Sequence, residues 1–136
     1  MSAPFLLDTH VILWMSAEQP LSPTAMAALR AAPEEPIYVS PISAWEIGIL
    51  VSRSRLSLHM HPARWFDRAL LAPNIRLAEM SPNTLISSSF LPGTPPRDPA
   101  DRILAATARE QGFCLLTRDR LLLEYGEKGH LQVLAC

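Results

Sequence analysis

Carboxylate side chains at separated points of the chain are the residues most able to do chemistry in this sequence. It holds only five aspartates, and four of them stand at predicted strand–helix junctions: Asp8, Asp98, Asp101 and Asp119. Carboxylate oxygens are the ligands that Mg²⁺ and Mn²⁺ prefer, whereas zinc sites are rich in His and Cys. One or two such ions activate a water and stabilise charge at phosphorus. We therefore predict that Asp8, Glu46, Asp101 and Asp119 hold divalent metal and catalyse phosphodiester cleavage.

Glu46 is the acid whose surroundings most favour a bound cation. Its neighbours on the helix surface are Ile42, Ile49 and Leu50, so the carboxylate lies on an apolar stripe. Burying an ionised carboxylate costs several kcal/mol unless it is paired or binds a cation. No Lys or Arg precedes Arg53 in that helix, so a metal ion would resolve the cost. The alternative is that Glu46 reaches water at the margin of the stripe, or pairs with an arginine distant in sequence.

Helix capping is the competing explanation for the aspartates. Aspartate is a favoured N-cap, and its charge is stabilised at the start of a helix. Residues 98–101 read as a capping sequence with Asp98 as N-cap, and Asp8 and Asp119 also precede predicted helices. If capping is their whole role, the chain is an interaction domain without catalytic activity.

Short apolar segments alternate with helical segments along the chain. The predicted strands cover residues 4–8, 37–40, 75–79, 113–117 and 131–134. The predicted helical segments cover residues 9–17, 22–31, 40–52, 61–72, 82–88, 99–111 and 119–125. This alternation is typical of an α/β sandwich with a mostly parallel sheet. We expect one domain over residues 1–136, because the length suits a single core and no linker or repeat is visible.

The order of strands and helices predicts that the acids meet. In open parallel sheets, ligands bind beyond the carboxyl ends of the strands. Asp8 closes the first strand, Glu46 lies early in the helix after the second strand, and Asp119 follows the fourth strand. Asp101 lies in the first turn of the helix that leads back to the fourth strand, and such a crossover helix begins at the carboxyl edge. All four acids are therefore expected at one edge of the sheet.

Composition narrows the classes of function. Apolar residues make up 49% of the chain and the net charge is −1, which weakens the case for a protein that reads nucleic acid through a basic face. The positive side chains are eleven arginines and one lysine, and arginine suits bidentate phosphate contacts. Arg53 and Arg55 are candidates for RNA phosphate contacts, and a solvated structural role is the alternative for both.

We expect a cytoplasmic protein with no membrane segment. The start of the chain carries Asp8 and His10 and lacks the basic leader of a signal peptide. No apolar run is long enough to span a bilayer. Cys114 and Cys136 lack metal-type spacing and have the character of reduced thiols in an intracellular protein.

Four short motifs, in this order, resemble those of a known family. They are LLDTHVILW, SAWEIGIL, DPADRILAATA and LLTRD. Together they resemble the PIN-domain ribonucleases, and within them the VapC-type toxins of bacterial toxin–antitoxin pairs, over almost the whole chain from Phe5 to Val133. The resemblance implies a three-layer α/β/α fold, homodimers, and Mg²⁺- or Mn²⁺-dependent endonucleolytic cleavage of an RNA substrate. It also implies a cognate antitoxin protein, with a segment that lies over the active-site groove.

The resemblance also assigns roles by position. It implies a catalytic, metal-binding set made of Asp8, Glu46, Asp101 and Asp119. Thr117 corresponds to a small hydroxyl residue that supports the metal shell or a substrate water. Asp98 and Asp101 compete for the third acid, and we prefer Asp101 because it stands just before the apolar ILAATA stretch, which leaves Asp98 to cap the helix or hold a water. Arg102 is expected to restrain a carboxylate or to face the substrate phosphate.

Aromatic and aliphatic side chains are candidates for the surface that meets such a partner. They are Trp14, Trp45, Trp65, Leu56 and Leu58. Core packing is the alternative for the tryptophans, and for Trp45 we expect the core. His10 lies two residues from Asp8, so an approach to the site is the alternative to the packing or surface role that we expect for it.

Two other functions use the same acids. A structure-selective DNA nuclease needs the same site, and the 2′-hydroxyl decides between the two polymers. A phospho-acceptor signalling module holds Mg²⁺ without cleaving a phosphodiester, but such a site requires a lysine near the phosphate. The only lysine, Lys128, lies in a Glu-Lys-Gly segment that no predicted strand presents.

Overall fold

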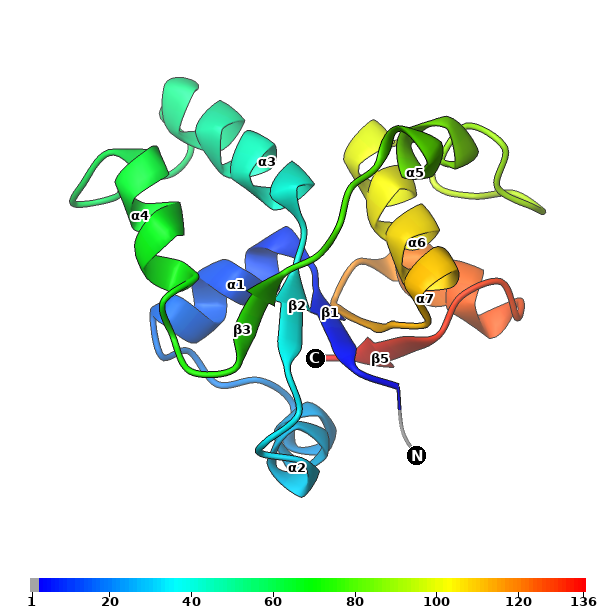
Figure 1. Ribbon diagram of the computed structural model, residues 1–136, viewed down its shortest axis with the longest axis horizontal. Coiled ribbons are helices and arrows are strands. Elements are labelled where there is room, and N and C mark those ends of the chain that lie inside the picture. Colours follow the sequence, from blue (N-terminus) through cyan, green and yellow to red (C-terminus); the bar gives the residue numbers. More distant parts are fainter. Residues whose placement is uncertain (1–2) are drawn as a thin grey trace.

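The computed structural model describes residues 3–136, so the first two residues of the predicted domain lie outside the described part. Five parallel strands form one sheet in the order β3-β2-β1-β4-β5. Their bounds are β1 Phe5–Leu7, β2 Ile37–Val39, β3 Ile75–Leu77, β4 Cys114–Thr117 and β5 Val133–Ala135. The chain builds outward from β1 to β3 and then returns to β4 on the other side of β1, so β1 and β4 flank the point where the strand order reverses (Figure 1).

Seven helices occur within residues 3–136. They are α1 Thr9–Ser16, α2 Pro23–Ala31, α3 Pro41–Ser52, α4 Pro62–Ala69, α5 Pro82–Ser87, α6 Pro99–Gln111 and α7 Arg120–Glu127. Five of them, α2 to α6, begin with proline, whose fixed φ suits the first helical position and whose missing N–H would have no partner there. The cap before each proline is Ser22, Ser40, His61, Ser81 or Asp98. Much of the proline content is therefore explained by helix starts.

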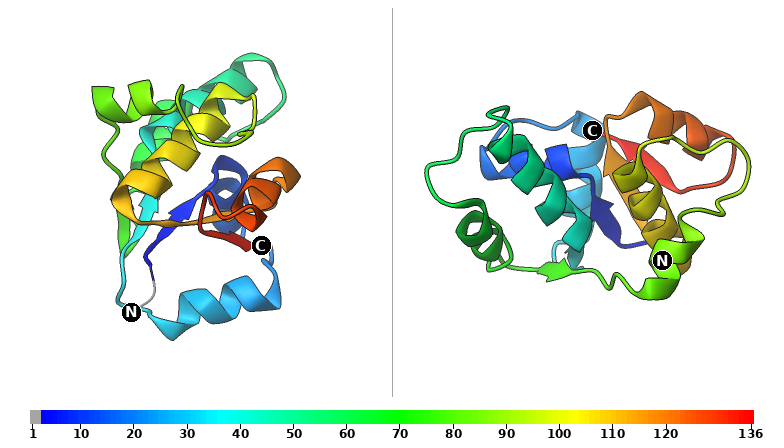
Figure 2. Two further views of the ribbon diagram at one scale, coloured as in Figure 1. Left: turned by 90° about the vertical axis from the view of Figure 1, so that its right-hand side faces the viewer. Right: turned by 90° about the horizontal axis from the view of Figure 1, so that it is seen from above.

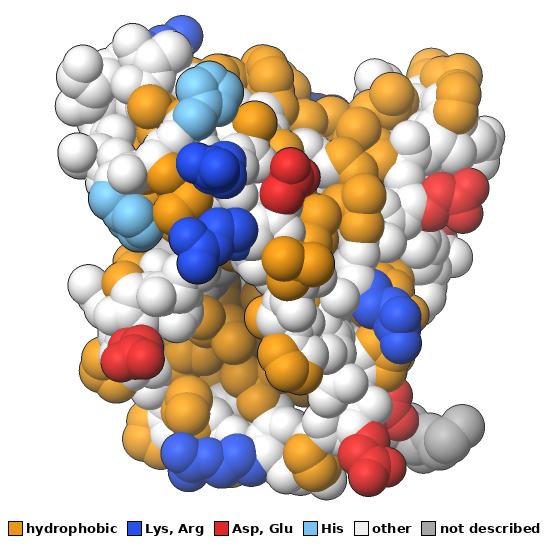
Figure 3. All heavy atoms as spheres, turned by 60° about the vertical axis from the view of Figure 1, so that its left-hand side comes forward, with side chains coloured by type: hydrophobic (Ala, Val, Ile, Leu, Met, Phe, Trp, Pro, Cys, Tyr) orange, Lys and Arg blue, Asp and Glu red, His pale blue; other side chains and the backbone are white. Residues whose placement is uncertain are grey.

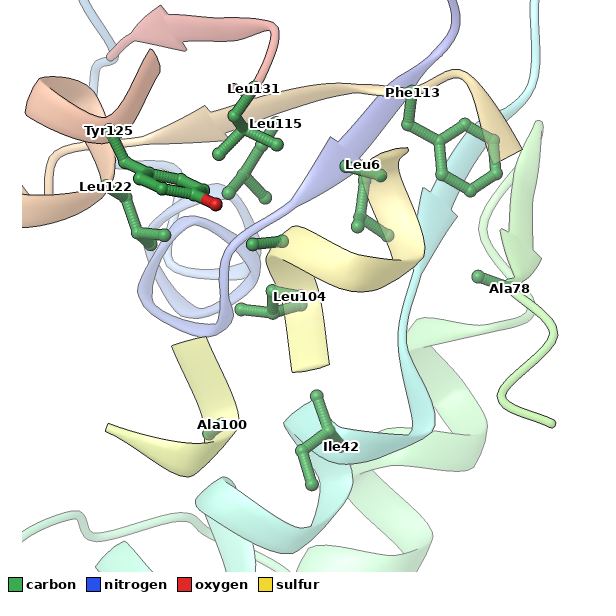
Figure 4. Close-up of a cluster of buried hydrophobic side chains, with 12 residues drawn as sticks. Leu6, Ile42, Ala78, Ala100, Leu104, Phe113, Leu115, Leu122, Tyr125 and Leu131 are labelled. Atoms are coloured by element: carbon green, nitrogen blue, oxygen red, sulfur yellow. The ribbon is translucent and has the colours of Figure 1, made fainter. Parts of the chain in front are cut away.

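Alternation along the strands divides the core between the two faces of the sheet. Leu6 of β1 and Leu115 of β4 point to one face, where they pack with Leu104 of α6 and Tyr125 of α7 (Figure 4). Their neighbours Leu7 and Leu116 point to the other face and pack against α1, α2 and α4. Helices thus cover both faces and give the three-layer α/β/α arrangement (Figures 1 and 2).

Helix α3 lies across the carboxyl ends of the strands and not flat on one face. Its Ile42 belongs to the core on the α6 side, and its Ile47 belongs to the core on the α1 side. The view from above shows α3 crossing over the sheet edge, with α6 beside it (Figure 2). A side chain between these two anchors therefore faces the edge at which the strands end.

The predicted α/β class and parallel sheet are confirmed, and the residue ranges differ mainly at element ends. The helix predicted over residues 61–72 stops earlier, with α4 ending at Ala69. Leu71 and Ala72 donate instead to Arg68 and Ala69, in tighter turns. The reason is Pro73, because proline disfavours the helical conformation in the residue before it.

Two further expectations concern the environment of the chain. Among the described residues, no helix has both the length and the apolar character needed to cross a membrane. Cys114 and Cys136 are both free thiols, and Cys136 is buried.

Candidate active site

The reversal point between β1 and β4 holds the first acid. Asp8 follows β1 directly, caps α1, and donates its own N–H to the carbonyl of Leu116 (3.0 Å). Its Oδ1 accepts the N–H of Thr9 (2.7 Å), and its Oδ2 accepts the hydroxyl of Thr117 (2.7 Å). Asp8 is 8% exposed, and Thr9 and Thr117 are fully buried. Both carboxylate oxygens are thus held by groups from two adjacent strand ends.

Thr117 links this acid to a second one. Its Oγ1 accepts the N–H of Asp119 (2.9 Å) while its hydroxyl proton goes to Asp8. Asp119 then caps α7, where its Oδ1 accepts the N–H of Leu122 (3.0 Å). The end of β4 therefore fixes Asp119 at the same sheet edge as Asp8.

Glu46 reaches the same edge from α3. It is half-buried on the arc of α3 that also buries Ser43 and Ile47. The hydroxyl of Thr9 donates to Glu46 Oε1, and Thr9 Oγ1 lies 2.9 Å from Ser43 Oγ. Thr9 therefore contacts both Glu46 and Asp8, which come from different elements.

Two further acids come from the start of α6. Asp98 caps the helix through the N–H of Ala100 (2.9 Å), as the sequence predicted. Asp101 follows in the first turn, and its carboxylate accepts no hydrogen bond from the part of the chain that the structure describes. α6 thus presents two carboxylates to this region. That of Asp98 caps the helix, and that of Asp101 has no hydrogen bond within residues 3–136.

All five acids line one open cavity of about 280 Å³: Asp8, Glu46, Asp98, Asp101 and Asp119. His10, Trp14 and Arg118 complete its rim. Three of the acids, Asp8, Asp98 and Asp119, are also helix caps. For these three residues, helix capping and clustering at one cavity are therefore both correct.

The crowded carboxylates raise one another's proton affinity. Burial, and then the charges of Asp98, Asp8, Asp119 and Glu46 in that order, together raise the pKa of Asp101 to about 8. Burial also raises the pKa of Asp8 and of Glu46, against the lowering effect of their threonine hydrogen bonds. The direction is the one expected for anions that share a site without a compensating cation.

Within residues 3–136, the protein's own cations do not neutralise this cluster. The ion pair found there, Arg120 with Glu124, lies on the surface of α7. Arg118 lines the cavity, but its guanidinium stacks on the ring of Trp14 (4.1 Å) and donates to the carbonyl of Pro20 (3.2 Å). Glu46 is therefore not held by a distant arginine.

The donor set fits a hard divalent cation. Every acidic ligand here offers oxygen, as Mg²⁺ and Mn²⁺ prefer, and the uncompensated charge favours cation binding. As the side chains stand, no three His, Cys, Asp or Glu residues in the described range already converge on one point that could hold an ion. Binding at this cavity therefore requires some of these carboxylates to rotate inward.

The structure corrects the expectation for Trp45 and places His10 and Arg102. Trp45 was expected in the core but is 55% exposed, because it precedes Glu46 by one residue and so projects about 100° around α3 from the buried arc. His10 is exposed, as its preferred surface role predicts, and it also lines the acidic cavity, which is the alternative that the sequence leaves open. Arg102 is absent from the cavity lining, and its charge acts on the hydroxyl of Tyr125.

Sequence reasoning missed the residues that hold the acids in place. The sequence patterns do not single out Thr9 and Ser43, although Thr9 adjoins Asp8 and Ser43 lies three residues before Glu46 on the same helix face. Arg118 was also missed. A search for buried hydroxyls next to each predicted acid would have found Thr9 and Ser43.

A second, more apolar groove of about 480 Å³ adjoins the acidic cavity. It runs between α1 and the segment that leads from α3 into α4, with Trp65, Leu56 and Leu58 in its lining. His10 and Trp14 line both hollows, so the two lie side by side. Elsewhere on the α4 side of the molecule, Figure 3 shows a hollow lined with hydrophobic side chains, below a group of basic and His side chains.

Comparison with known proteins places these features in context. The sequence model of the PIN domain matches residues 5–128. Ribonuclease VapC22 of Mycobacterium tuberculosis is 39% identical over 118 residues, which are 86% of this chain and 88% of that protein.

Solved structures share the fold. VapBC2 from Rickettsia felis, bound to a DNA fragment from its promoter, aligns with a TM-score of 0.67 at 14% identity, over 96% of this chain and 97% of that chain. A toxin–antitoxin complex from Klebsiella pneumoniae aligns with a TM-score of 0.54 at 24% identity, over 84% and 85% of the two chains.

Proposed function

The chain belongs to the PIN-domain family, and from that premise we propose that it is a divalent-metal-dependent endoribonuclease acting as the toxin of a toxin–antitoxin pair. The observation that carries the proposal is the convergence of five carboxylates on one cavity in which no cation of residues 3–136 forms an ion pair with them. Caps alone do not require this arrangement, because Glu46 and Asp101 cap nothing and still face the cavity. The relative's name, a ribonuclease, supports RNA as the substrate.

We assign the metal to Asp8, Glu46, Asp101 and Asp119, with Mg²⁺ or Mn²⁺ as the ion. When bound, such an ion supplies Lewis-acid stabilisation of the phosphate and an activated water. The chain's own part is to hold Asp8 and Asp119 in place through Thr117, and Glu46 through Thr9. Asp98 keeps the first turn of α6 in register, so that Asp101 stays at the cavity.

Substrate positioning is assigned to the rim of the cavity. His10 and the stacked pair of Arg118 and Trp14 stand beside the acids, where a cationic or hydrogen-bonding group meets the phosphates that flank the scissile bond. Lys128 ends α7 and is absent from the cavity lining, so the phospho-acceptor alternative lacks the lysine that it needs.

An antitoxin is the partner that the relatives support, because solved structures of this fold are toxin–antitoxin complexes. We place its segment in the groove that contains Trp14, Trp65, Leu56 and Leu58 and shares His10 and Trp14 with the acidic cavity. A peptide there would bury apolar surface and cover the route to the acids. A toxin of this kind acts on RNA in the cytoplasm, which is the location we propose.

A second copy of the chain is proposed to bind near α5. Ile86 is 62% exposed and Phe90 is 79% exposed, which leaves large apolar side chains close together in sequence without cover. Ile86→Glu should then convert a dimer into a monomer in sedimentation velocity. A monomeric wild-type protein would contradict this assignment.

The function is tested by incubating the protein with matched single-stranded RNA and DNA in Mn²⁺, with EDTA and Asp8→Asn as controls. We expect cleavage of RNA that EDTA and the substitution both abolish. Cleavage of DNA alone would favour the DNA nuclease, and no cleavage of either polymer would favour a binding domain.

A further inference from the structure

We propose that Thr9 is a positioning residue that sets Glu46 at a fixed place relative to Asp8 for metal binding. This inference rests on the proposed function, because it concerns how the metal-binding pocket is held. Thr9 lies at the first position of α1 and is 1% exposed. A buried hydroxyl needs partners, and one of those of Thr9, Glu46, lines the acidic cavity.

The contacts of Thr9 join two elements that carry acids. Its backbone N–H donates to Asp8 Oδ1 (2.7 Å), so the residue is fixed to the end of β1. Its side chain crosses to α3, where it contacts Glu46 Oε1 and Ser43 Oγ. Thr9 thus connects Asp8, at the end of β1, to Glu46 on α3.

The direction of the hydroxyl proton follows from the partners. A hydroxyl has one proton, and an ionised carboxylate only accepts, so Thr9 donates to Glu46. Thr9 Oγ1 also lies 2.9 Å from the hydroxyl oxygen of Ser43, which is fully buried. Because Ser43 and Glu46 lie one turn apart on α3, the two contacts also fix the rotation of that helix against α1.

No other described residue forms a hydrogen bond with Glu46. Loss of the Thr9 hydroxyl would therefore free the carboxylate to turn toward water, since it is only half-buried. Outer-shell hydrogen bonds to metal ligands commonly contribute about 10- to 100-fold in metal affinity. That magnitude makes the contact measurable.

The test measures Mn²⁺ binding to the purified, metal-stripped full chain by isothermal titration calorimetry, together with the melting temperature without metal. The variants are Thr9→Val, which keeps the shape but loses the hydroxyl, and Thr9→Ser, which keeps the hydroxyl. Thr107→Val is the matched control, because Thr107 is equally buried and its hydroxyl bonds only to the Ile103 carbonyl of its own helix (2.7 Å).

We expect Thr9→Val to weaken Mn²⁺ affinity at least about tenfold, and Thr9→Ser to stay within about threefold of the wild type. Thr107→Val should lower the melting temperature but leave Mn²⁺ affinity unchanged. If Thr9→Val binds Mn²⁺ as the wild type does, Thr9 has only a packing role and the proposal is overturned.

A second variant covers the case in which Thr9→Val does not fold. Ser43→Ala removes the hydroxyl that orients Thr9, and we expect it to weaken Mn²⁺ affinity by roughly threefold. Unchanged affinity in Ser43→Ala would then overturn the proposal. A wild-type chain that neither binds Mn²⁺ nor cleaves RNA would instead defeat the proposed function, which separates the two failures.

Discussion

The two sides of the acidic cavity are built differently. On the side of β1, β4 and α3, each of Asp8, Glu46 and Asp119 has a hydrogen-bond partner, and Thr9 and Thr117 join the three into one chain of contacts. On the side of α6, Asp101 has no such partner among residues 3–136, and its pKa is raised to about 8.

The difference shows that the two sides contribute different properties to the cavity: one fixes the positions of the acids, and the other adds uncompensated negative charge. On the sheet side, two buried threonines, Thr9 and Thr117, hold the acids in place through hydrogen bonds. On the other side, α6 contributes the carboxylate of Asp101, whose charge is electrostatically unfavourable without a cation. The sheet side therefore sets the geometry of the pocket, and the α6 side sets its demand for positive charge.

Asp8→Asn should have the largest effect, because it removes the charge that both threonines hold at the centre of the pocket. We expect RNA cleavage to fall by about 1,000-fold or more, equivalent to roughly 4 kcal/mol of barrier. The melting temperature without metal should change by only a few degrees, since burial already raises the pKa of this carboxyl. Initial rates and thermal melts measure both. Retained activity with a lower melting temperature would leave Asp8 as a cap alone.

Asp101→Asn and Asp98→Asn form a matched pair on α6. We expect Asp101→Asn to reduce cleavage about 100-fold, because a metal ligand is lost. Asp98→Asn should cost about tenfold or less, because asparagine caps helices as well as aspartate does. Rates measured in saturating Mn²⁺ decide between them. The reverse order would make Asp98 the third acid.

Thr117→Val should reduce activity by about 10- to 100-fold, because it removes the hydroxyl that holds Asp8 and receives the N–H of Asp119. Thr117→Ser keeps that hydroxyl and should restore most of the rate. Equal losses in both variants would assign the effect to packing in the buried strand end.

The stability of the metal-free chain should depend on pH through Asp101. Its folded-state pKa, about 8, lies above the ordinary 3.8, so the folded state holds the proton more tightly. The contribution of this proton to the stability of the folded state is therefore complete at low pH, and it is lost as pH rises toward about 8. Melting temperatures should fall by a few degrees between about pH 5 and pH 8. Asp101→Asn should flatten that slope, and Mn²⁺ should raise the melting temperature most at the higher pH. An unchanged slope in the variant would remove Asp101 as the source.

Much of the fold was accessible from local signals in the sequence. Proline preceded by Ser or Asp marked the starts of α2, α3, α5 and α6, and Gly112 marked the end of α6, where it adopts a positive φ of 71°. The strand order could not be read from such signals, because it depends on which segments pair across long separations. The family resemblance supplied the three layers.

The acids were accessible, but their supports were not. Asp8, Glu46, Asp101 and Asp119 were predicted from junction positions and an apolar stripe, and the structure brings them to one cavity. The roles of Thr9 and Ser43 depend on how α3 rotates against α1, and that rotation is set by tertiary packing. Trp45 shows the same limit, since the helix period alone did not reveal which arc of α3 is buried.

The most direct test of the central claim is a crystal structure of the chain soaked in Mn²⁺, with the ion located by its anomalous scattering. We predict a peak in the cavity, within about 2.0–2.3 Å of carboxylate oxygens from both Asp8 and Asp101. Glu46 and Asp119 should lie in contact with the ion or with its bound waters. A cavity free of Mn²⁺ at a saturating concentration, with Glu46 turned away from Asp8, would contradict the account.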